Sequence, residues 1–194
     1  MSTETKPRKQ RVPAAERRDS LITAAIEEFA ATGYHGTPVD RIARRIGIAQ
    51  PYVFSLFKSK RDLFIAALER GFQITGDTFE QAADGVPAGT PNRADLTLPA
   101  MASAYYALVA SNPQLLMLQL HGYAACDDPE IQQHVRDAYA RLVNRIIVAS
   151  EATIDDVDEF MRYGMWLNVT AAMGVKDLSA GCDWVVGARP SAAA

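Results

Sequence analysis

Apolar residues recur along most of this chain at the spacing of a helix face, and few segments alternate between apolar and polar positions. The clearest case is Val39, Ile42, Ala43 and Ile46, which follow the i, i+3, i+4, i+7 pattern of one buried helix face. Because strand-like alternation is scarce over the 194 residues, the pattern predicts an all-α protein with about nine helices.

Residues 36–57 predict two short helices joined by a tight turn. Thr37 and Asp40 have the spacing of a T-x-x-D capping box at the start of the first of these helices. Gly47 follows that helix directly, where the backbone needs a residue that tolerates positive φ. Two short helices that cross closely predict a helix-turn-helix, whose second helix, starting near Gln50, enters the major groove of DNA. The alternative is an ordinary helical hairpin in a core.

Further helices are predicted on both sides of this pair. An amphipathic segment precedes it and ends at Gly33, and a long helix begins after Ser59, which forms a second capping box with Asp62. Residues 84–99 contain three prolines and two glycines and predict a loop. The helices expected after this loop span 99–111, 113–125, 129–150 and 155–174, with a short one around 184–186.

The charge distribution divides the chain into a basic first third and an acidic remainder. Residues 1–70 carry a net charge of +5 and residues 71–194 a net charge of −8. This asymmetry is typical of a module that meets a polyanion, joined to one that does not, although chance patchiness is an equal alternative. The predicted organisation is a flexible basic arm at 1–12, a helix-turn-helix domain at 13–70, a helical effector-binding and dimerisation domain at 71–188, and a tail at 189–194.

Three runs of residues resemble the DNA-binding domain of TetR-family transcriptional regulators: FAATGYHGT from Phe29, DRIARRIGI from Asp40 and VFSLFKSKRDLF from Val53. The resemblance implies a three-helix DNA-binding domain joined by a long fourth helix to a helical bundle. It also implies a homodimer that binds double-stranded DNA at a palindromic operator and is released by a small-molecule effector, as a repressor is. The chain departs from the family at Ala49, where Ser or Thr is usual, and at Tyr52, which is bulkier than usual.

The start of the second short helix carries the side chains expected to reach bases. Gln50 can make a bidentate contact with adenine, and Pro51 and Tyr52 can pack on a thymine methyl group. The family pattern also places Phe54 and Ser55 against the backbone or the bases.

Four other residues are expected to contact phosphates. Lys60 matches the phosphate-binding lysine of the family, and Thr37 can donate a hydrogen bond from the start of its helix. Arg44 and Arg45 lie near the end of the first short helix. For these two, solvated surface charge is an equal alternative.

The last long helix, residues 155–174, is the expected dimer contact. It offers a face of small and apolar residues, namely Phe160, Gly164, Leu167, Ala171 and Gly174. The resemblance implies that two copies of this face pack in a four-helix bundle. The alternative is that the face packs inside one chain.

The C-terminal region is rich in aromatic residues and methionine, which can enclose an apolar ligand. The candidate ligand-binding residues, each of which is alternatively a core or surface residue, are Phe72, Tyr105, Met117, His121, Tyr139, Met165, Trp166 and Asn168. Because Arg162 is the main basic residue in these helices, the sequence favours a neutral or cationic lipophilic effector over an acidic one.

Other functional classes have less support in the sequence. Cys126 and Cys182 form no C-x-x-C pair and predict free thiols in a reducing cytosol. No apolar run approaches the roughly 18 residues of a membrane span, and no signal peptide is evident, so a cytoplasmic location without membrane contact is expected. We find no catalytic constellation, cofactor motif or metal signature. The remaining alternative is a helical ligand-binding protein or enzyme that does not bind DNA.

Overall fold

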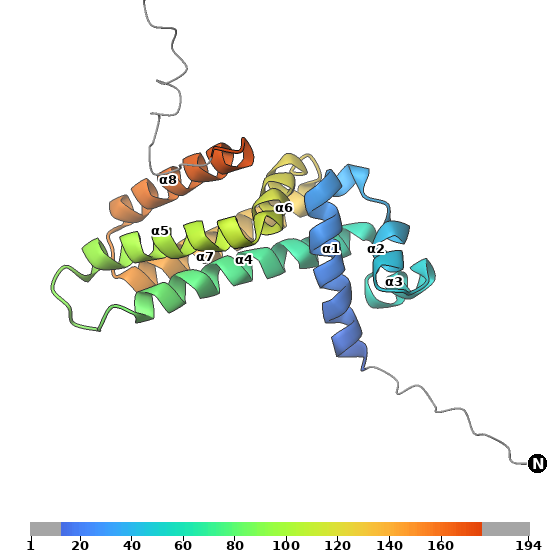
Figure 1. Ribbon diagram of the computed structural model, residues 1–194, viewed down its shortest axis with the longest axis horizontal. Coiled ribbons are helices and arrows are strands. Elements are labelled where there is room, and N and C mark those ends of the chain that lie inside the picture. The colour runs from blue at the N-terminus through green and yellow to red at the C-terminus, as the bar shows by residue number, and fades with distance from the viewer. Residues whose placement is uncertain (1–12, 176–194) are drawn as a thin grey trace, which may run out of the picture.

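The computed structural model describes residues 13–175, which form eight α-helices and no strand (Figure 1). The prediction of an all-α protein is confirmed for this part of the chain. The predicted arm at 1–12, the short helix around 184–186, the tail and Cys182 lie outside the described residues. The helices are α1 (Ala14–Gly36), α2 (Val39–Arg45), α3 (Gln50–Leu56), α4 (Lys60–Asp84), α5 (Arg93–Ser111), α6 (Pro113–Ala124), α7 (Pro129–Ser150) and α8 (Ile154–Ala172).

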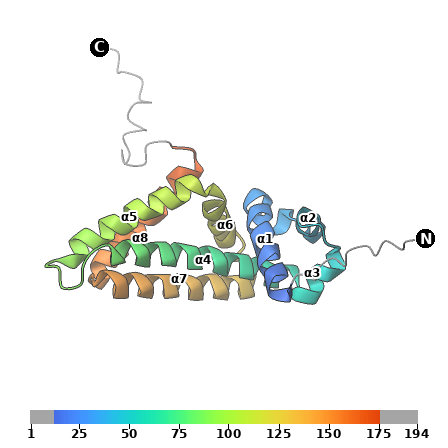
Figure 2. The same ribbon diagram turned by 60° about the horizontal axis from the view of Figure 1, so that its bottom comes forward.

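Helix α4 connects the two ends of the molecule. Figure 2 shows α1–α3 gathered at one end, and α4 leading from them into the bundle beside α7. The first turns of α4 bury Leu63 and Phe64 in one apolar core, and its later turns bury Phe72 and Phe79 in a second core. The domain boundary expected at residue 70 therefore falls inside a continuous helix.

The end of α1 corrects one sequence prediction. Gly33 interrupts the helix with φ of 70° and ψ of 178°, which confirms that the regular helix ends there. Thr37 does not cap α2, because its side chain is fully buried and its hydroxyl lies 2.7 Å from the carbonyl oxygen of Gly33 and 3.1 Å from that of Glu28. The predicted capping box of Thr37 with Asp40 is thus wrong, since the Thr37 hydroxyl is directed to carbonyl groups of α1 and α2 has no side-chain cap.

Helix α5 begins six residues earlier than the prolines predicted. Arg93, at its first position, donates hydrogen bonds to the carbonyl oxygens of Ala83 at 2.9 Å, Val86 at 3.3 Å and Ala149. These contacts tie the start of α5 to the ends of α4 and α7, and Pro99 is accommodated inside the helix. The loop is therefore shorter than the expected 84–99, because contacts between distant residues outweigh the local preference of proline.

The predicted starts of three other helices are confirmed. The side chain of Ser59 accepts a hydrogen bond from the backbone N–H of Asp62, and Asp128 caps α7 by accepting from two backbone N–H groups. Thr153 and Asp156 form a complete capping box at the start of α8. None of the helices within residues 13–175 combines the length and the apolar character needed to cross a membrane.

Helix α6 packs closely on α1 and α4. A Cβ atom added to Gly33 would lie 2.9 Å from Nδ1 of His121, and one added to Gly122 would lie 2.6 Å from a methyl carbon of Leu68. Leu118 of α6 belongs to the same core as the helices of the N-terminal end. The first core thus joins α6 to the helices of the N-terminal end.

We predict that Gly33→Ala lowers the free energy of unfolding by about 1–3 kcal/mol, because its backbone conformation is nearly exclusive to glycine and its Cβ would press on His121. Urea denaturation followed by circular dichroism measures this change. Gly36→Ala is the control, since its added Cβ would lie 3.4 Å from Thr32 Cβ at the nearest. Equal stability of the two variants would contradict the prediction.

Candidate DNA interface and effector pocket

Helices α2 and α3 form the predicted helix-turn-helix. Gly47 has φ of 67° in the turn, and the backbone N–H of Ile48 donates to the carbonyl oxygen of Ala43 at 3.0 Å. Ala43 and Val53 are buried at the crossing of the two helices. Ala49 precedes α3 without a side-chain cap, as the sequence predicted. The motif lies at one extremity of the molecule, with α3 on the outside (Figures 1 and 2).

A cluster of charged side chains holds α2 against α1. Glu28 of α1 is only 8% exposed, and it forms ion pairs with Arg41 and with Arg45, the latter at 3.0 Å. Arg45 also pairs with Glu27. A buried carboxylate needs such partners, because an unpaired charge would be costly there. Arg45 therefore helps to position α2, and its predicted phosphate contact stays a prediction.

The N-terminal half of α3 presents the predicted base-reading side chains to solvent. Gln50 and Pro51 are exposed, and Phe54 is 43% exposed. Tyr52 is half-buried, with the guanidinium of Arg17 lying 5.5 Å from the centre of its ring. The exposed Ser55 donates its hydroxyl to the carbonyl oxygen of Tyr52 at 2.7 Å, so its proton is already used within α3. Their contacts with DNA stay predictions.

The structure revises the set of cations around α3. The buried hydroxyl of Thr37 cannot reach a phosphate, so that predicted contact is wrong for the side chain. Arg44 is exposed and pairs with Asp40 one turn earlier. The ammonium of Lys60 lies 5.1 Å from the ring of Tyr34, and burial lowers its pKa.

The sequence analysis did not identify three cationic side chains that lie near α3. Arg17 and Arg18 lie in the first turn of α1 and contact the rings of Tyr52 and Phe57, the latter at 4.2 Å. Lys58 is exposed directly after α3. The basic first third of the chain indicated their positive charge. The proximity of Arg17 and Arg18 to α3, however, depends on how α1 crosses that helix.

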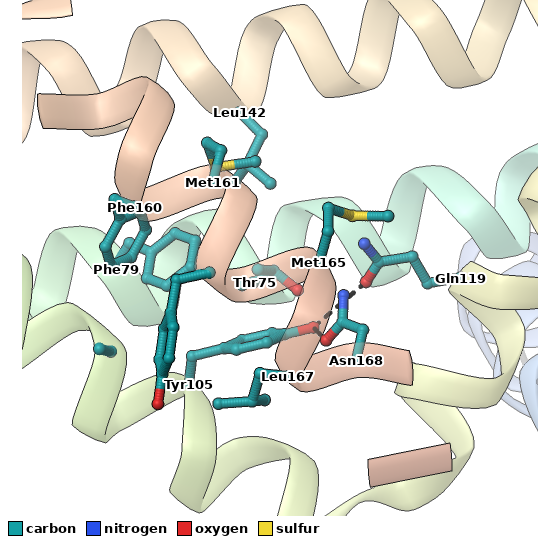
Figure 3. A pocket seen from close by; sticks show the side chains of 13 residues that line it. Thr75, Phe79, Tyr105, Gln119, Leu142, Phe160, Met161, Met165, Leu167 and Asn168 are labelled. Carbon is teal, nitrogen blue, oxygen red and sulfur yellow. Dashed lines mark hydrogen bonds between the residues drawn. The ribbon is translucent and has the colours of Figure 1, made fainter. Parts of the chain in front are cut away.

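Helices α4–α8 enclose a largely apolar pocket (Figure 3). The free volume of this pocket is only about 40 Å³, so its own side chains nearly fill it. It is lined by Thr75, Phe79, Ala102, Tyr105, Gln119, Leu142, Phe160, Met161, Tyr163, Gly164, Met165, Leu167 and Asn168.

One end of the pocket carries a network of polar side chains. The hydroxyl of Tyr105 donates to Oδ1 of Asn168 at 2.8 Å, and Nε2 of Gln119 donates to the hydroxyl of Tyr123 at 2.6 Å. Burial raises the pKa of Tyr105 above its usual value and raises the pKa of Tyr123 to about 12. Both phenols therefore stay protonated over the physiological range and act as neutral hydrogen-bonding groups.

Three predicted ligand-binding residues, Tyr105, Met165 and Asn168, line this pocket. The other five lie elsewhere: Phe72 and Tyr139 pack in or against the second core, Met117 packs against the first core, His121 lies against Gly33, and Trp166 is 38% exposed. Sequence reasoning missed Phe79 and Phe160, whose apolar spacing indicated buried helix faces without showing which face borders a cavity.

The predicted dimer face of α8 is mostly turned inward. Phe160, Gly164 and Leu167 line the pocket, and Leu167 is buried, so these residues lie toward the bundle, while a dimer contact through α8 stays a prediction. A different stripe of apolar side chains on α8 faces solvent. It consists of Tyr163, Trp166, Val169 and Met173, which are 38–57% exposed.

Residues 21–67 match the family model described as bacterial regulatory proteins, tetR family. A curated relative, the HTH-type transcriptional activator FasR of Mycolicibacterium smegmatis, is 43% identical over 63 residues, which are 32% of this chain and 29% of the relative. The matched stretches span about half or less of the curated relatives that the chain matches.

Two solved structures share the fold over most of the chain. The transcriptional regulator FadR from Bacillus subtilis, in complex with stearoyl-CoA, has a TM-score of 0.66 and 22% identity, and the match covers 87% of this chain and 95% of that one. A transcriptional regulator from Saccharomonospora viridis, in complex with choline, has a TM-score of 0.66 and 19% identity, with 84% and 89% covered. At these identities the likeness shows the fold alone.

We predict that stability falls with rising pH above the ordinary tyrosine pKa of 10.0 and that Tyr123→Phe weakens this dependence. The folded pKa is raised to about 12, so the folded state keeps a proton that the unfolded state loses between these values. Thermal unfolding at pH 9 to 11.5 measures the slope. The exposed Tyr163→Phe is the control, and equal slopes in both variants would contradict the prediction.

Proposed function

We propose that this chain, a tetR-family protein by its N-terminal domain, is a cytoplasmic, dimeric regulator of transcription that binds a specific DNA sequence. The observation that carries the proposal is the helix-turn-helix at one end of the molecule, with the N-terminal half of α3 exposed. Its proposed mode is repression that a small lipophilic ligand relieves.

Base reading is assigned to the exposed start of α3. Gln50 has the donor and acceptor geometry for adenine, while Pro51 and the Phe54 ring offer apolar surface to thymine methyl groups. Phosphate contacts are assigned to exposed or half-buried cations around α3, namely Arg17, Arg18, Arg44, Lys58 and Lys60. Such contacts fix the register of the protein on DNA without reading the sequence.

Dimerisation is assigned to the solvent-facing stripe of α8. A single α3 reads only a few base pairs, so a specific site requires two copies related by a two-fold axis. Tyr163, Trp166, Val169 and Met173 recur about every three to four residues, which places them along one side of the helix. Burial of such a stripe against its copy would remove apolar surface from water.

The pocket is assigned to the effector. Helix α6 contributes Gln119 to the pocket and, two residues later, packs His121 against Gly33 at the end of α1. A ligand that displaces Gln119 therefore acts on the helix that supports the helix-turn-helix. Ligand binding would favour an arrangement in which the two α3 helices no longer match the operator spacing.

The ligands of similar proteins leave the effector class open. FadR of Bacillus subtilis is solved with stearoyl-CoA, which is anionic, and the Saccharomonospora viridis regulator with choline, which is cationic. Since both share this fold, the charge of the ligand follows from the side chains of each pocket rather than from the fold.

We predict that selection from genomic fragments by the full chain enriches a palindrome, and that Gln50→Ala weakens binding to it by on the order of 1–3 kcal/mol while relaxing its base preference. Fluorescence anisotropy with the palindrome and with a scrambled duplex measures both effects. The comparison variant is Arg45→Lys, which changes a cation that is paired with Glu27 and Glu28 rather than a predicted base-reading side chain. Absence of any enriched palindrome, or an equal loss on both duplexes, would contradict the proposal.

We predict that Trp166→Glu converts a dimer into monomers, because two buried carboxylates would face each other across the two-fold axis. Sedimentation velocity measures the oligomeric state. Leu96→Glu, at an exposed apolar position of α5 outside the stripe, is the matched control and keeps the dimer. A Trp166→Glu protein that remained dimeric would remove α8 from the interface.

A further inference from the structure

An open acidic groove lies between α5 and α8. It has a volume of about 380 Å³ and is lined by Ala94, Asp95, Leu98, Pro99, Ala102, Asp156, Glu159 and Phe160. Asp95 and Glu159 are exposed, and within residues 13–175 neither forms an ion pair. The groove thus presents negative charge above an apolar floor.

The groove continues into the effector pocket, because Ala102 and Phe160 line both. On α5, Asp95, Ala102 and Tyr105 follow one side of the helix from the groove to the polar end of the pocket. The ten residues from Asp95 to Tyr105 rise about 15 Å along the helix. Groove and pocket therefore adjoin, and together they extend about as far as an extended chain of roughly a dozen carbon atoms.

Aromatic rings form the middle of this site. The ring of Phe79 lies 5.6 Å from that of Phe160 and 5.6 Å from that of Tyr105 (Figure 3). Aromatic faces carry partial negative charge and attract cations. A positive group at the groove would thus meet both carboxylates and the ring of Phe160.

The inner end of the site carries a buried polar group with spare hydrogen-bonding capacity. Asn168 is 3% exposed and lines the pocket, and its Oδ1 accepts from the hydroxyl of Tyr105. Among the described residues its amide nitrogen donates no hydrogen bond. The pair of Tyr105 and Asn168 thus gives the inner end of the site a neutral, polar character.

We propose that the effector is an amphiphilic cation, with its positive group between Asp95 and Glu159 and its apolar body along Phe160, Phe79 and Tyr105. This inference rests on the proposed function, because it names the ligand class of the same pocket. No Lys, Arg or His is among the described residues that line the pocket or the groove. An acyl-CoA would place its phosphates against carboxylates there, with no cation to offset them.

The pocket must widen to admit such a ligand, because only about 40 Å³ is free. Met161 and Met165 line the wall formed by α8. Methionine side chains are unbranched and flexible, so they can change rotamer to make room without unfolding the helix. Displacement of Met165 and Gln119 would transmit ligand entry to α6, which carries the contact with Gly33.

The test is direct binding of dodecyltrimethylammonium, dodecanoate and dodecanoyl-CoA to the purified full chain by isothermal titration calorimetry, below their critical micelle concentrations. The cation is expected to bind at least tenfold more tightly than either anion. Asp95→Asn with Glu159→Gln should weaken cation binding by about two- to fivefold per charge removed and leave anion binding unchanged or improved. Asp156 is left unchanged, because it caps α8.

The matched control is Asp155→Asn, which neutralises an exposed carboxylate in the first turn of α8 outside the groove, and cation affinity should stay within twofold. Ala102 lines both the groove and the pocket. Ala102→Phe should therefore weaken binding of the cation while the circular dichroism of the protein stays unchanged. Equal or tighter binding of the anions, or an equal loss in the control, would overturn the proposal. Because no DNA is present, this outcome is independent of whether an operator is found.

Discussion

The backbone turn at Gly33 is the constraint on which both ends of the molecule depend. Its φ of 70° ends the regular part of α1 and brings carbonyl groups of that helix to the buried hydroxyl of Thr37, just before α2. The same turn lies so close to α6 that a Cβ would press on His121. One residue thus sets the position of α2 relative to α1 and the approach of the bundle to both.

Helix α6 connects the turn at Gly33 to the pocket, because two of its faces make different contacts. Gln119 and Tyr123 join the polar network of the pocket, while His121 and Gly122 pack on α1 and α4. Protein interiors are close-packed, so a helix held on both sides cannot adjust on one side alone. The end that carries the helix-turn-helix and the end that carries the pocket are therefore joined through α6.

The local elements and their chemistry were readable from the residues in order. Apolar spacing predicted the helices, Gly33 and Gly47 predicted the two turns, and Ser59 predicted a cap that is present. Gln50 and Pro51, which are predicted to read bases, are exposed, and their contacts with DNA stay predictions. These predictions succeed because capping and backbone conformation depend on neighbours within a few residues, and helix periodicity depends on one face alone.

Sequence alone determined that the protein is helical, that it carries a helix-turn-helix, and that its two parts differ in charge. Only the tertiary structure decided which side chains meet. It assigned Thr37 and Arg45 to the support of α2, turned Phe160 and Leu167 inward, and brought Asp95 and Glu159 to the same groove. The physical reason is that periodicity marks a buried face without naming its partner, and that a charge or hydroxyl is committed by contacts with residues distant in the chain.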